Sequence, residues 1–534
     1  MPHFAEAFQR LDQFVARYRQ TQHVPGMAIA LTDRANLLHV AAYGYADVER
    51  QLAVRPETLF EIGSISKSFT CMVLLQLQDE GKIDIHAPVT TYLPWFAVQS
   101  PYAPISIHHL MSHTAGISSG VDPAPTSRYS VHLLRDTRPA YAPGEHFHYS
   151  NVAFQALGYL LEEIEGKSYA EIIRERILAP LGMDATEPAM TNQMRAKLAA
   201  GYSAFYDDRP LTLNGPLTPA TWLECGAGDG SISSTVADMA IYLRSLLKAG
   251  QSPVLSQANY RLMTQKVIPM ERDRFYGYGL MIGEQDGYAT VGHTGDMVGY
   301  HSIMLGDSEH GLGVIVLLNG PVDPTPIGST ALRFLRAAYR DEPLPEVPAI
   351  PAPTSIENAR EYVGEYRGSG QMLKIEQDGE QLRLIYKEQP IVLERLHARD
   401  LFYANHPDFA LFPLRFEREE GMVVACTYGE RWYSHSERGQ AFVTTYPLGW
   451  KQVTGHYRSY NPWRTNFRVI LRRGQLYYVD PDGWEERLTP LNEHTFCVGD
   501  PQFSPEYIRF DVFINEQAQR ATLSGGEFFR TFTP

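Results

Sequence analysis

The chain has 534 residues, more than one ordinary hydrophobic core accommodates, so we expect two to four domains. Its net charge of −14 argues against a nucleic-acid partner, because such a protein needs a basic surface to neutralise phosphates. The four cysteines are far apart and match no metal-ligand spacing, so we expect buried, reduced thiols and no metal site.

The first twenty residues predict an amphipathic helix rather than a signal peptide. Their apolar side chains recur at helical spacing with charges between them, at Phe4, Phe8, Leu11, Phe14, Val15 and Tyr18. No apolar run in the chain approaches the roughly 18 residues of a membrane span. We therefore expect a cytoplasmic protein with no membrane partner.

The next 320 residues mix strands and helices. Two strands, 27–32 and 37–43, are joined by a turn, and a long helix over 64–80 is ended by Gly81. Further helices are predicted at 107–112, 151–165, 169–179 and 235–249, and further strands at 278–282, 300–305 and 313–318. This order predicts one sheet, flanked by helices, that contains both ends of the domain.

The composition changes where five prolines crowd between residues 341 and 354, which favours an extended linker. Beyond it, short alternating segments replace the helical periodicity. We predict a domain over 1–342, a linker over 343–356, and two β-barrel domains over 357–447 and 448–534.

The duplication of the barrel is predicted from an internal repeat. The segment Tyr362-Val-Gly-Glu-Tyr366-Arg returns as Val453-Thr-Gly-His-Tyr457-Arg, and three shorter matches follow in the same order at intervals of about 90 to 97 residues. Each copy is long enough for a small antiparallel barrel.

The strongest chemical signal is the segment Phe60-Glu-Ile-Gly-Ser64-Ile-Ser-Lys67. Residues three apart on a helix share a face, so the Lys67 ammonium can approach the Ser64 hydroxyl. A serine needs such a neighbour or a base to become a nucleophile. Backbone N–H groups of the first helical turn point to the same place and can stabilise an oxyanion.

Two more motifs follow in order, Tyr149-Ser-Asn151 and His293-Thr294-Gly295. With these three motifs the chain resembles the serine β-lactamase and penicillin-binding-protein superfamily, in particular its class C-like esterase and D-aminopeptidase branch. The resemblance spans roughly Pro25 to Asn319. It implies an α+β catalytic domain with an antiparallel sheet flanked by helices, here followed by two lipocalin-like antiparallel barrels.

The resemblance also implies the residue roles. Ser64 is expected to be the nucleophile, Lys67 its activating partner and Tyr149 the general base that returns the proton to the leaving group. A tyrosine ordinarily keeps its proton at neutral pH, and a cationic neighbour favours the phenolate. Asn151 is expected to bind the acyl-side amide, and the backbone N–H groups of Ser64 and Asp296 to form the oxyanion hole. No metal or organic cofactor is expected.

One departure from the usual motif of the family narrows the expected substrate class. Where β-lactamases and penicillin-binding proteins usually carry Lys-Thr-Gly, this chain has His293-Thr294-Gly295, and an ordinary histidine is mostly neutral at pH 7. The resemblance therefore favours small esters, amides or short peptides with a free amino end. A penicillin-recognising DD-carboxypeptidase or a β-lactamase is the alternative enzyme.

Other interpretations remain open. The segment Gly116-Ile-Ser118-Ser-Gly120 matches the G-x-S-x-G nucleophile elbow, which makes Ser118 the alternative nucleophile, although that elbow needs a strand before it. The chain is also compatible with a non-catalytic module that binds a ligand or partner, and with a homo-oligomer. The layout of one catalytic domain and two barrels is similar to that of bacterial D-aminopeptidases.

Overall fold

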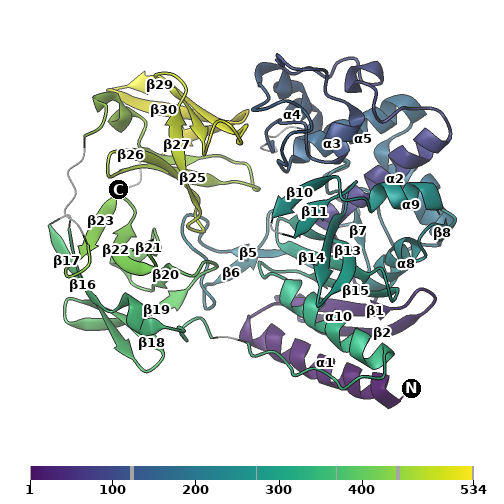
Figure 1. Ribbon diagram of the computed structural model, residues 1–534, viewed down its shortest axis with the longest axis horizontal. Helices are drawn as coiled ribbons and strands as arrows, with labels where there is room; N and C mark the ends of the chain where they lie inside the picture. The colour runs from purple at the N-terminus through teal and green to yellow at the C-terminus, as the bar shows by residue number, and fades with distance from the viewer. Residues whose placement is uncertain are drawn as a thin grey trace. The chain divides into compact units, whose positions relative to one another are not determined.

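The computed structural model describes residues 2–120, 126–271, 273–350, 352–368, 370–439 and 445–531. The chain divides into two compact units (Figure 1). The first contains Met1–Ser203 and Leu217–Ala349, and the second contains Ala204–Pro216 and Ile350–Pro534. Among the described helices, none combines the length and the apolar character that crossing a bilayer requires.

A nine-stranded antiparallel sheet forms the middle of the first unit. Its strands lie in the order β10 (Ile268–Glu271), β11 (Arg274–Tyr276), β12 (Met281–Gln285), β13 (Tyr288–Met297), β14 (Tyr300–Asp307), β15 (Leu312–Leu318), β1 (Gly26–Thr32), β2 (Leu37–Asp47) and β3 (Leu52–Ala53). Strand β15 pairs with β1, with Met27 opposite Leu318. The prediction that both ends of this unit share one sheet is therefore confirmed.

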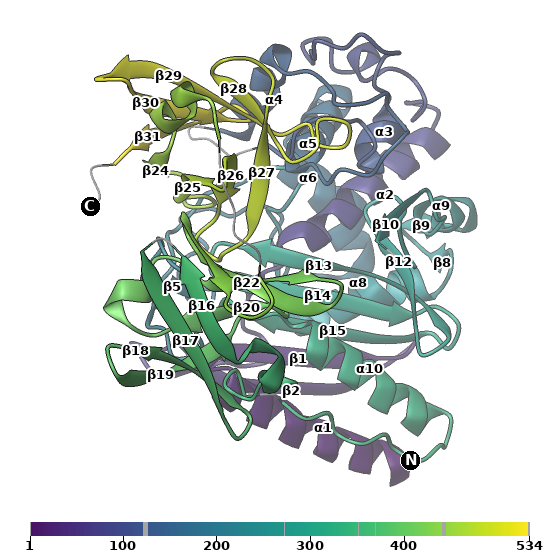
Figure 2. The same cartoon turned by 60° about the vertical axis from the view of Figure 1, so that its left-hand side comes forward.

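Helices cover both faces of this sheet. In chain order they are α1 (Pro2–Thr21), α2 (Ser66–Asp79), α3 (Ile107–Met111), α4 (Ser127–Leu133), α5 (Asn151–Glu165), α6 (Tyr169–Ile173), α7 (Ala179–Leu181), α8 (Val236–Leu247), α9 (Gln257–Met263) and α10 (Thr325–Tyr339). Figure 2 shows α1 and α10 running side by side along the sheet.

Two positions on β14 show how the faces are divided between α8 and α10. Residues an odd number apart on a strand point to opposite faces. Ile303 lies against Gly328 of α10, whereas the backbone of Gly306 lies against Leu243 and Leu247 of α8. Strand β15 is buried along its whole length because both faces are covered.

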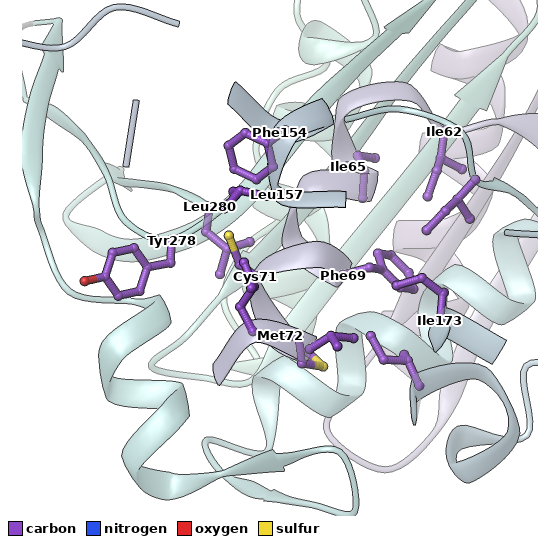
Figure 3. Close-up of a cluster of buried hydrophobic side chains, with 14 of the residues drawn as sticks. Ile62, Ile65, Phe69, Cys71, Met72, Phe154, Leu157, Ile173, Tyr278 and Leu280 are labelled. Carbon is purple, nitrogen blue, oxygen red and sulfur yellow. The ribbon is translucent and has the colours of Figure 1, made fainter. Parts of the chain in front are cut away.

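Helix α2, which follows the Ser64 motif, lies in the centre of the hydrophobic core. Its residues 66–75 are all buried, which is typical of a helix surrounded by other elements. Figure 3 shows Phe69, Cys71 and Met72 of α2 among side chains from several other segments, including Phe154, Leu157, Ile173 and Leu280. The helix that carries the predicted site is thus held rigidly.

We expect Phe69→Ala to lower the free energy of unfolding by about 3–5 kcal/mol, because it leaves a cavity in this core. The Phe69 ring is fully buried and stacks on Tyr242 with centroids 3.7 Å apart. Urea unfolding of the folded protein measures the loss, with Tyr102→Ala at an exposed position as the control. A loss no larger than that of the control would contradict the assigned packing.

The structure corrects the predicted strand over 278–282. Residues 277–280 instead form the turn between β11 and β12, and β12 begins at Met281. Gly279 has a φ of +66°, and a Cβ atom there would lie 2.7 Å from the carbonyl oxygen of Lys67. The turn therefore packs its backbone directly against the first turn of α2.

The predicted helix over 169–179 is also corrected, because a π-helical segment, η4 (Arg174–Leu178), separates α6 from α7. Strands β10, β11 and β13 were not predicted as separate elements.

The second unit contains two closed antiparallel barrels of eight strands each, which confirms the predicted fold class. The first consists of β16 (Gly364–Gly368), β17 (Gln371–Asp378), β18 (Gln381–Tyr386), β19 (Gln389–Arg395), β20 (Leu401–Ala404), β21 (Leu414–Glu419), β22 (Met422–Tyr428) and β23 (Arg431–His435). The second consists of β24 (Gly455–Arg458), β25 (Asn466–Arg472), β26 (Gln475–Val479), β27 (Glu485–Pro490), β28 (Thr495–Val498), β29 (Tyr507–Ile514), β30 (Gln517–Leu523) and β31 (Gly526–Arg530).

The repeat has a structural counterpart at the first strand of each barrel. The Tyr366 hydroxyl donates to the carbonyl of Tyr362 at 2.7 Å, and the Tyr457 hydroxyl donates to that of Val453 at 2.8 Å. Each tyrosine is buried and four residues after its acceptor. The same hydrogen bond thus recurs at the first strand of both barrels.

The segment Ala204–Pro216 belongs to the second unit although the chain around it belongs to the first. Asp207 pairs with Arg458, and Arg468 donates to the carbonyl of Asp208 at 2.7 Å. The structure assigns no helix or strand to residues 343–350 and 352–356 of the predicted linker, and Pro351 lies outside the described residues. The predicted domain boundaries themselves remain predictions.

Candidate active site

Ser64 lies in a tight turn between a short strand and the central helix. Strand β4 (Phe60–Glu61) leads into the 3-10 turn η1 (Gly63–Ile65), and α2 begins at Ser66. The turn passes very close to β13. A Cβ atom on Gly63 would lie 2.7 Å from the backbone N of Asp296, and one on Gly295 would lie 1.9 Å from the carbonyl oxygen of Ile62. Glycine at both positions brings Ser64 and Asp296 together.

Lys67 is completely buried and makes three hydrogen bonds. Its Nζ donates to Ser64 Oγ at 2.9 Å, to Asn151 Oδ1 at 2.8 Å and to the carbonyl oxygen of Asp229 at 2.8 Å. An ammonium group has three N–H donors and no acceptor, so all of its donors are used. The predicted approach of Lys67 to Ser64 is confirmed, and the Ser64 hydroxyl hydrogen remains free to point to another acceptor.

Asn151 is the first residue of α5, and its position is fixed by the helix cap. Ser150 caps the helix by accepting from the Ala153 N–H at 3.2 Å, and its own hydroxyl donates to the carbonyl of Ser118 at 2.7 Å. Only the side-chain oxygen of Asn151 can accept from Lys67, so its NH₂ group points away from the ammonium. That orientation leaves an N–H donor for a carbonyl of a bound molecule.

The face of the Tyr149 ring lies against the Lys67 ammonium. The Lys67 Nζ lies 4.9 Å from the Tyr149 ring centroid, a cation–π contact, and its hydrogen bonds go to other residues. The ring also packs on His113, with centroids 4.2 Å apart. The structure therefore brings Ser64, Lys67, Tyr149 and Asn151 together.

His113 is a neutral support for Tyr149. It is 1% exposed, and its Nδ1 accepts from the Ser150 N–H at 3.0 Å. Burial, reinforced by the nearby Lys67 charge, holds the pKa of His113 well below its usual value. Sequence reasoning assigned His113 no role beside Tyr149.

His293 is also buried, and both of its ring nitrogens are engaged within the protein. Its Nδ1–H donates to the carbonyl of Thr294 at 2.5 Å, so Nε2 accepts from the Tyr276 hydroxyl at 3.0 Å. Burial lowers the pKa of His293 to about 3, and the Lys67 charge acts in the same direction. The imidazole is therefore neutral, as the sequence indicated. Its partner Tyr276 was missed.

The remaining residues of this motif lie along β13. Thr294 is half-buried and Gly295 is buried against the Ser64 turn. The Asp296 side chain is exposed, and its carboxylate lies 3.3 Å from the His301 imidazole. Asp296 is thus placed to contribute its backbone to the site, while its carboxylate faces outward.

A buried carboxyl beside Lys67 was not predicted. Asp229 is 8% exposed, and its Oδ2 accepts from Gln155 Nε2 at 3.2 Å. Burial raises the pKa of Asp229, and the positive charge of Lys67 opposes that shift. Asp229 lies in the glycine-rich segment Gly226-Ala-Gly228-Asp-Gly230, and no local sequence pattern indicates its contact with Lys67.

The alternative nucleophile Ser118 lacks the geometry of an elbow. Residues 116–120 form neither strand nor helix, and Ser118 is 2% exposed. Its Oγ has no hydrogen-bond partner among the residues that the structure describes. No activating base therefore contacts it in that part of the chain.

Comparison with known proteins gives a consistent result. A family model, Beta-lactamase, matches residues 11–338. "Penicillin-binding protein 4" of Amycolatopsis lactamdurans is 28% identical over 386 residues, covering 69% of this chain and 98% of that protein. "Protein flp" of Staphylococcus aureus strain N315 is 29% identical over 203 residues, covering 36% of this chain and 41% of that protein. The chain thus spans about two fifths of the length of the flp proteins it matches.

Solved structures share the fold. The octameric penicillin-binding protein homologue from Pyrococcus abyssi has a TM-score of 0.59 and 24% identity, covering 80% of this chain and 99% of that one. The penicillin binding protein from Bacillus halodurans has a TM-score of 0.51 and 22% identity, covering 61% and 98%. Since the family model covers more than half of the residues, the chain belongs to the beta-lactamase family, whose fold supports serine hydrolase activity.

Proposed function

We propose that the protein hydrolyses small ester, amide or peptide substrates through a covalent acyl-enzyme on Ser64. The observation that carries this proposal is the saturated hydrogen bonding of Lys67. Its ammonium donates to Ser64 Oγ, so the serine oxygen is polarised while its hydrogen stays available to a base. Tyr149, whose ring face contacts the same ammonium, is the proposed base.

In this mechanism Ser64 Oγ attacks the substrate carbonyl carbon as its proton passes to Tyr149, which acts as the phenolate and becomes the neutral phenol. The carbonyl oxygen becomes negative and is stabilised by the backbone N–H groups of Ser64 and Asp296, which the close approach at Gly63 supports. Tyr149 then protonates the leaving group, and the acyl-enzyme forms. A water molecule, activated by Tyr149, releases the acid and restores Ser64. The NH₂ group of Asn151 binds the acyl-side carbonyl of the substrate.

The neutral character of His293 supports substrates without an essential carboxylate at that position. A Lys at this motif would offer a permanent positive charge, whereas His293 is buried, neutral and hydrogen-bonded to Tyr276. We therefore favour esterase, amidase or D-aminopeptidase activity. The names of the relatives favour one alternative, a penicillin-recognising carboxypeptidase or β-lactamase, and turnover of nitrocefin would support it. The octameric relative makes a homo-oligomer a further proposal.

Mass spectrometry of the intact protein tests the acyl-enzyme. We expect a fluorophosphonate, and a slowly hydrolysed p-nitrophenyl ester, to add one group to the peptide that contains Ser64 and none to the Ser64→Ala variant. A parallel panel of p-nitrophenyl esters and D- and L-amino-acid p-nitroanilides identifies the leaving group and the preferred stereochemistry. A label on Ser118 would overturn the assignment, and a folded protein that resists both reagents would favour a non-catalytic module.

A further inference from the structure

A cavity in the first unit has no assigned role. It has a volume of about 530 Å³ and is lined by residues from four segments, 46–52, 192–202, 219–223 and 298–300, together with Glu61. Ser64, Lys67 and Tyr149 are not among its lining residues. Even so, Glu61 is three residues before Ser64, and Val298 is two residues after Asp296. The cavity therefore adjoins the two segments that build the candidate active site.

Glu61 is a buried carboxyl with no counter-ion among the residues that the structure describes. It is 5% exposed and forms no hydrogen bond or ion pair with a side chain in the described parts of the chain. Burial alone raises the pKa of Glu61 to about 8. An ionised carboxylate in this position lacks a counter-ion, and buried charges in proteins are normally paired. None of the described residues that line the cavity forms an ion pair with Glu61.

Besides Glu61, the charged and titratable groups that line the cavity are Asp47, Glu49, Arg50, Arg195, Tyr202 and Tyr300. Two of them already form an ion pair, because Arg50 Nε lies 3.6 Å from Asp47 Oδ2. The Arg195 guanidinium lies over the Trp222 ring, 5.8 Å from its centroid, and makes no ion pair with Glu61. Burial raises the pKa of both Tyr202 and Tyr300, so neither supplies a charge near neutral pH.

The walls of the cavity are suited to an organic cation. The Tyr300 hydroxyl donates to the carbonyl of Ala199, and the Tyr202 hydroxyl accepts from the Val48 N–H, so both polar ends are engaged. What Tyr202, Trp222 and Tyr300 offer in addition is aromatic surface. Aromatic faces around a carboxylate attract an ammonium group by cation–π and charge interactions.

We propose that this cavity binds the ammonium group of a small organic amine, with Glu61 as its counter-ion. The amine is either the free amino end of a substrate or a separate ligand. Only the first of these rests on the proposed function. Binding transfers the Glu61 proton to solvent, because the carboxyl must be ionised to pair with the ammonium.

Isothermal titration with n-butylammonium chloride at constant ionic strength tests the site, with 1-butanol as the neutral isostere. We expect binding of the amine only, with about a tenfold gain in affinity per pH unit from pH 6 to pH 8 and a plateau above. The affinity rises with pH because the pKa of Glu61 is raised. Below a pH of about 8, protons compete with the amine for the carboxylate. At pH 7, titration in two buffers of different ionisation enthalpy should show release of nearly one proton.

Two isosteric variants locate the interaction. Glu61→Gln should lose at least tenfold in affinity and all proton release, whereas Glu57→Gln, which removes an exposed carboxylate that does not line the cavity, should retain both. Thermal unfolding confirms that both variants are folded. Equal affinity in Glu61→Gln and wild type, or no binding by the wild type up to high millimolar amine, would overturn the proposal.

Kinetics distinguish the two sources of the amine. If n-butylammonium inhibits ester hydrolysis competitively, the cavity holds the amino end of a substrate. If it binds and leaves both KM and kcat unchanged, the cavity holds a separate ligand. The titration itself needs no catalytic turnover, so failure of the Ser64 mechanism and failure of this site are observed separately.

Discussion

Replacement of Lys67 by alanine is expected to lower kcat/KM for the best ester substrate by at least about 1,000-fold. The ammonium is the only group seen to donate to Ser64 Oγ in the described structure, and it also holds Asn151 and the carbonyl of Asp229. Its loss removes the polarisation of the nucleophile and unlocks the amide that orients the substrate. Steady-state kinetics on p-nitrophenyl esters measure the change.

The double variant Ser64→Ala/Lys67→Ala tests whether the two residues act as one catalytic unit. Groups that act as one catalytic unit show non-additive losses, so Ser64→Ala, Lys67→Ala and the double variant should be almost equally impaired. Lys67→Met, which keeps the length of the buried side chain, separates loss of charge from loss of packing. Lys248→Ala, at an exposed position, is the neutral control. Multiplying losses in the double variant would show that the two residues act independently.

The sequence predicted only part of the spatial arrangement of the three motifs. The contact between Ser64 and Lys67 follows from their spacing, since residues three apart in a helical turn share a face. Tyr149 and Asn151 lie more than 80 residues further on, and their arrival at Lys67 was expected only from the family resemblance. The third acceptor of Lys67 is a main-chain carbonyl, which any residue carries. For this reason no sequence pattern marks position 229.

The strands around the site illustrate a second limit. Strand β13 carries His293, Thr294 and Gly295, yet it contains two glycines and is buried on both faces over much of its length. It therefore lacks the apolar–polar alternation that identifies a half-buried strand. Strand β11 is three residues long, too short for any periodicity, although it supplies Tyr276. The hydrogen bond between Tyr276 and His293 was accordingly invisible before the fold was known.

The sequence also did not indicate that the segment Ala204–Pro216 belongs to the second unit. Its aspartates pair with arginines of the second barrel that lie about 250 residues further along the chain. Nothing in the local composition, which is rich in turn-forming residues, indicates that partner. By contrast, the repeated Tyr-containing segments correctly predicted two barrels, because a repeat is visible in the sequence itself and each copy makes the same local hydrogen bond.

Tyr149→Phe is expected to lower kcat by about 100- to 10,000-fold and to leave KM nearly unchanged. The substitution removes one oxygen atom and keeps the ring that packs on His113 and faces the Lys67 ammonium. The proton of Ser64 would then have no acceptor at this position, so attack and leaving-group protonation should both be slowed. Burst kinetics with a p-nitrophenyl ester show whether acylation is the step affected.

Two other tyrosines supply controls for this prediction. Tyr276→Phe removes a hydroxyl from the same aromatic cluster, where it donates to His293, and should cost less than about tenfold in kcat because it removes one hydrogen bond. Tyr129→Phe, at an exposed position, should have no effect. A Tyr149→Phe variant as active as wild type would show that the proton leaves Ser64 by another route, and Lys67 would then be the remaining base in contact with it.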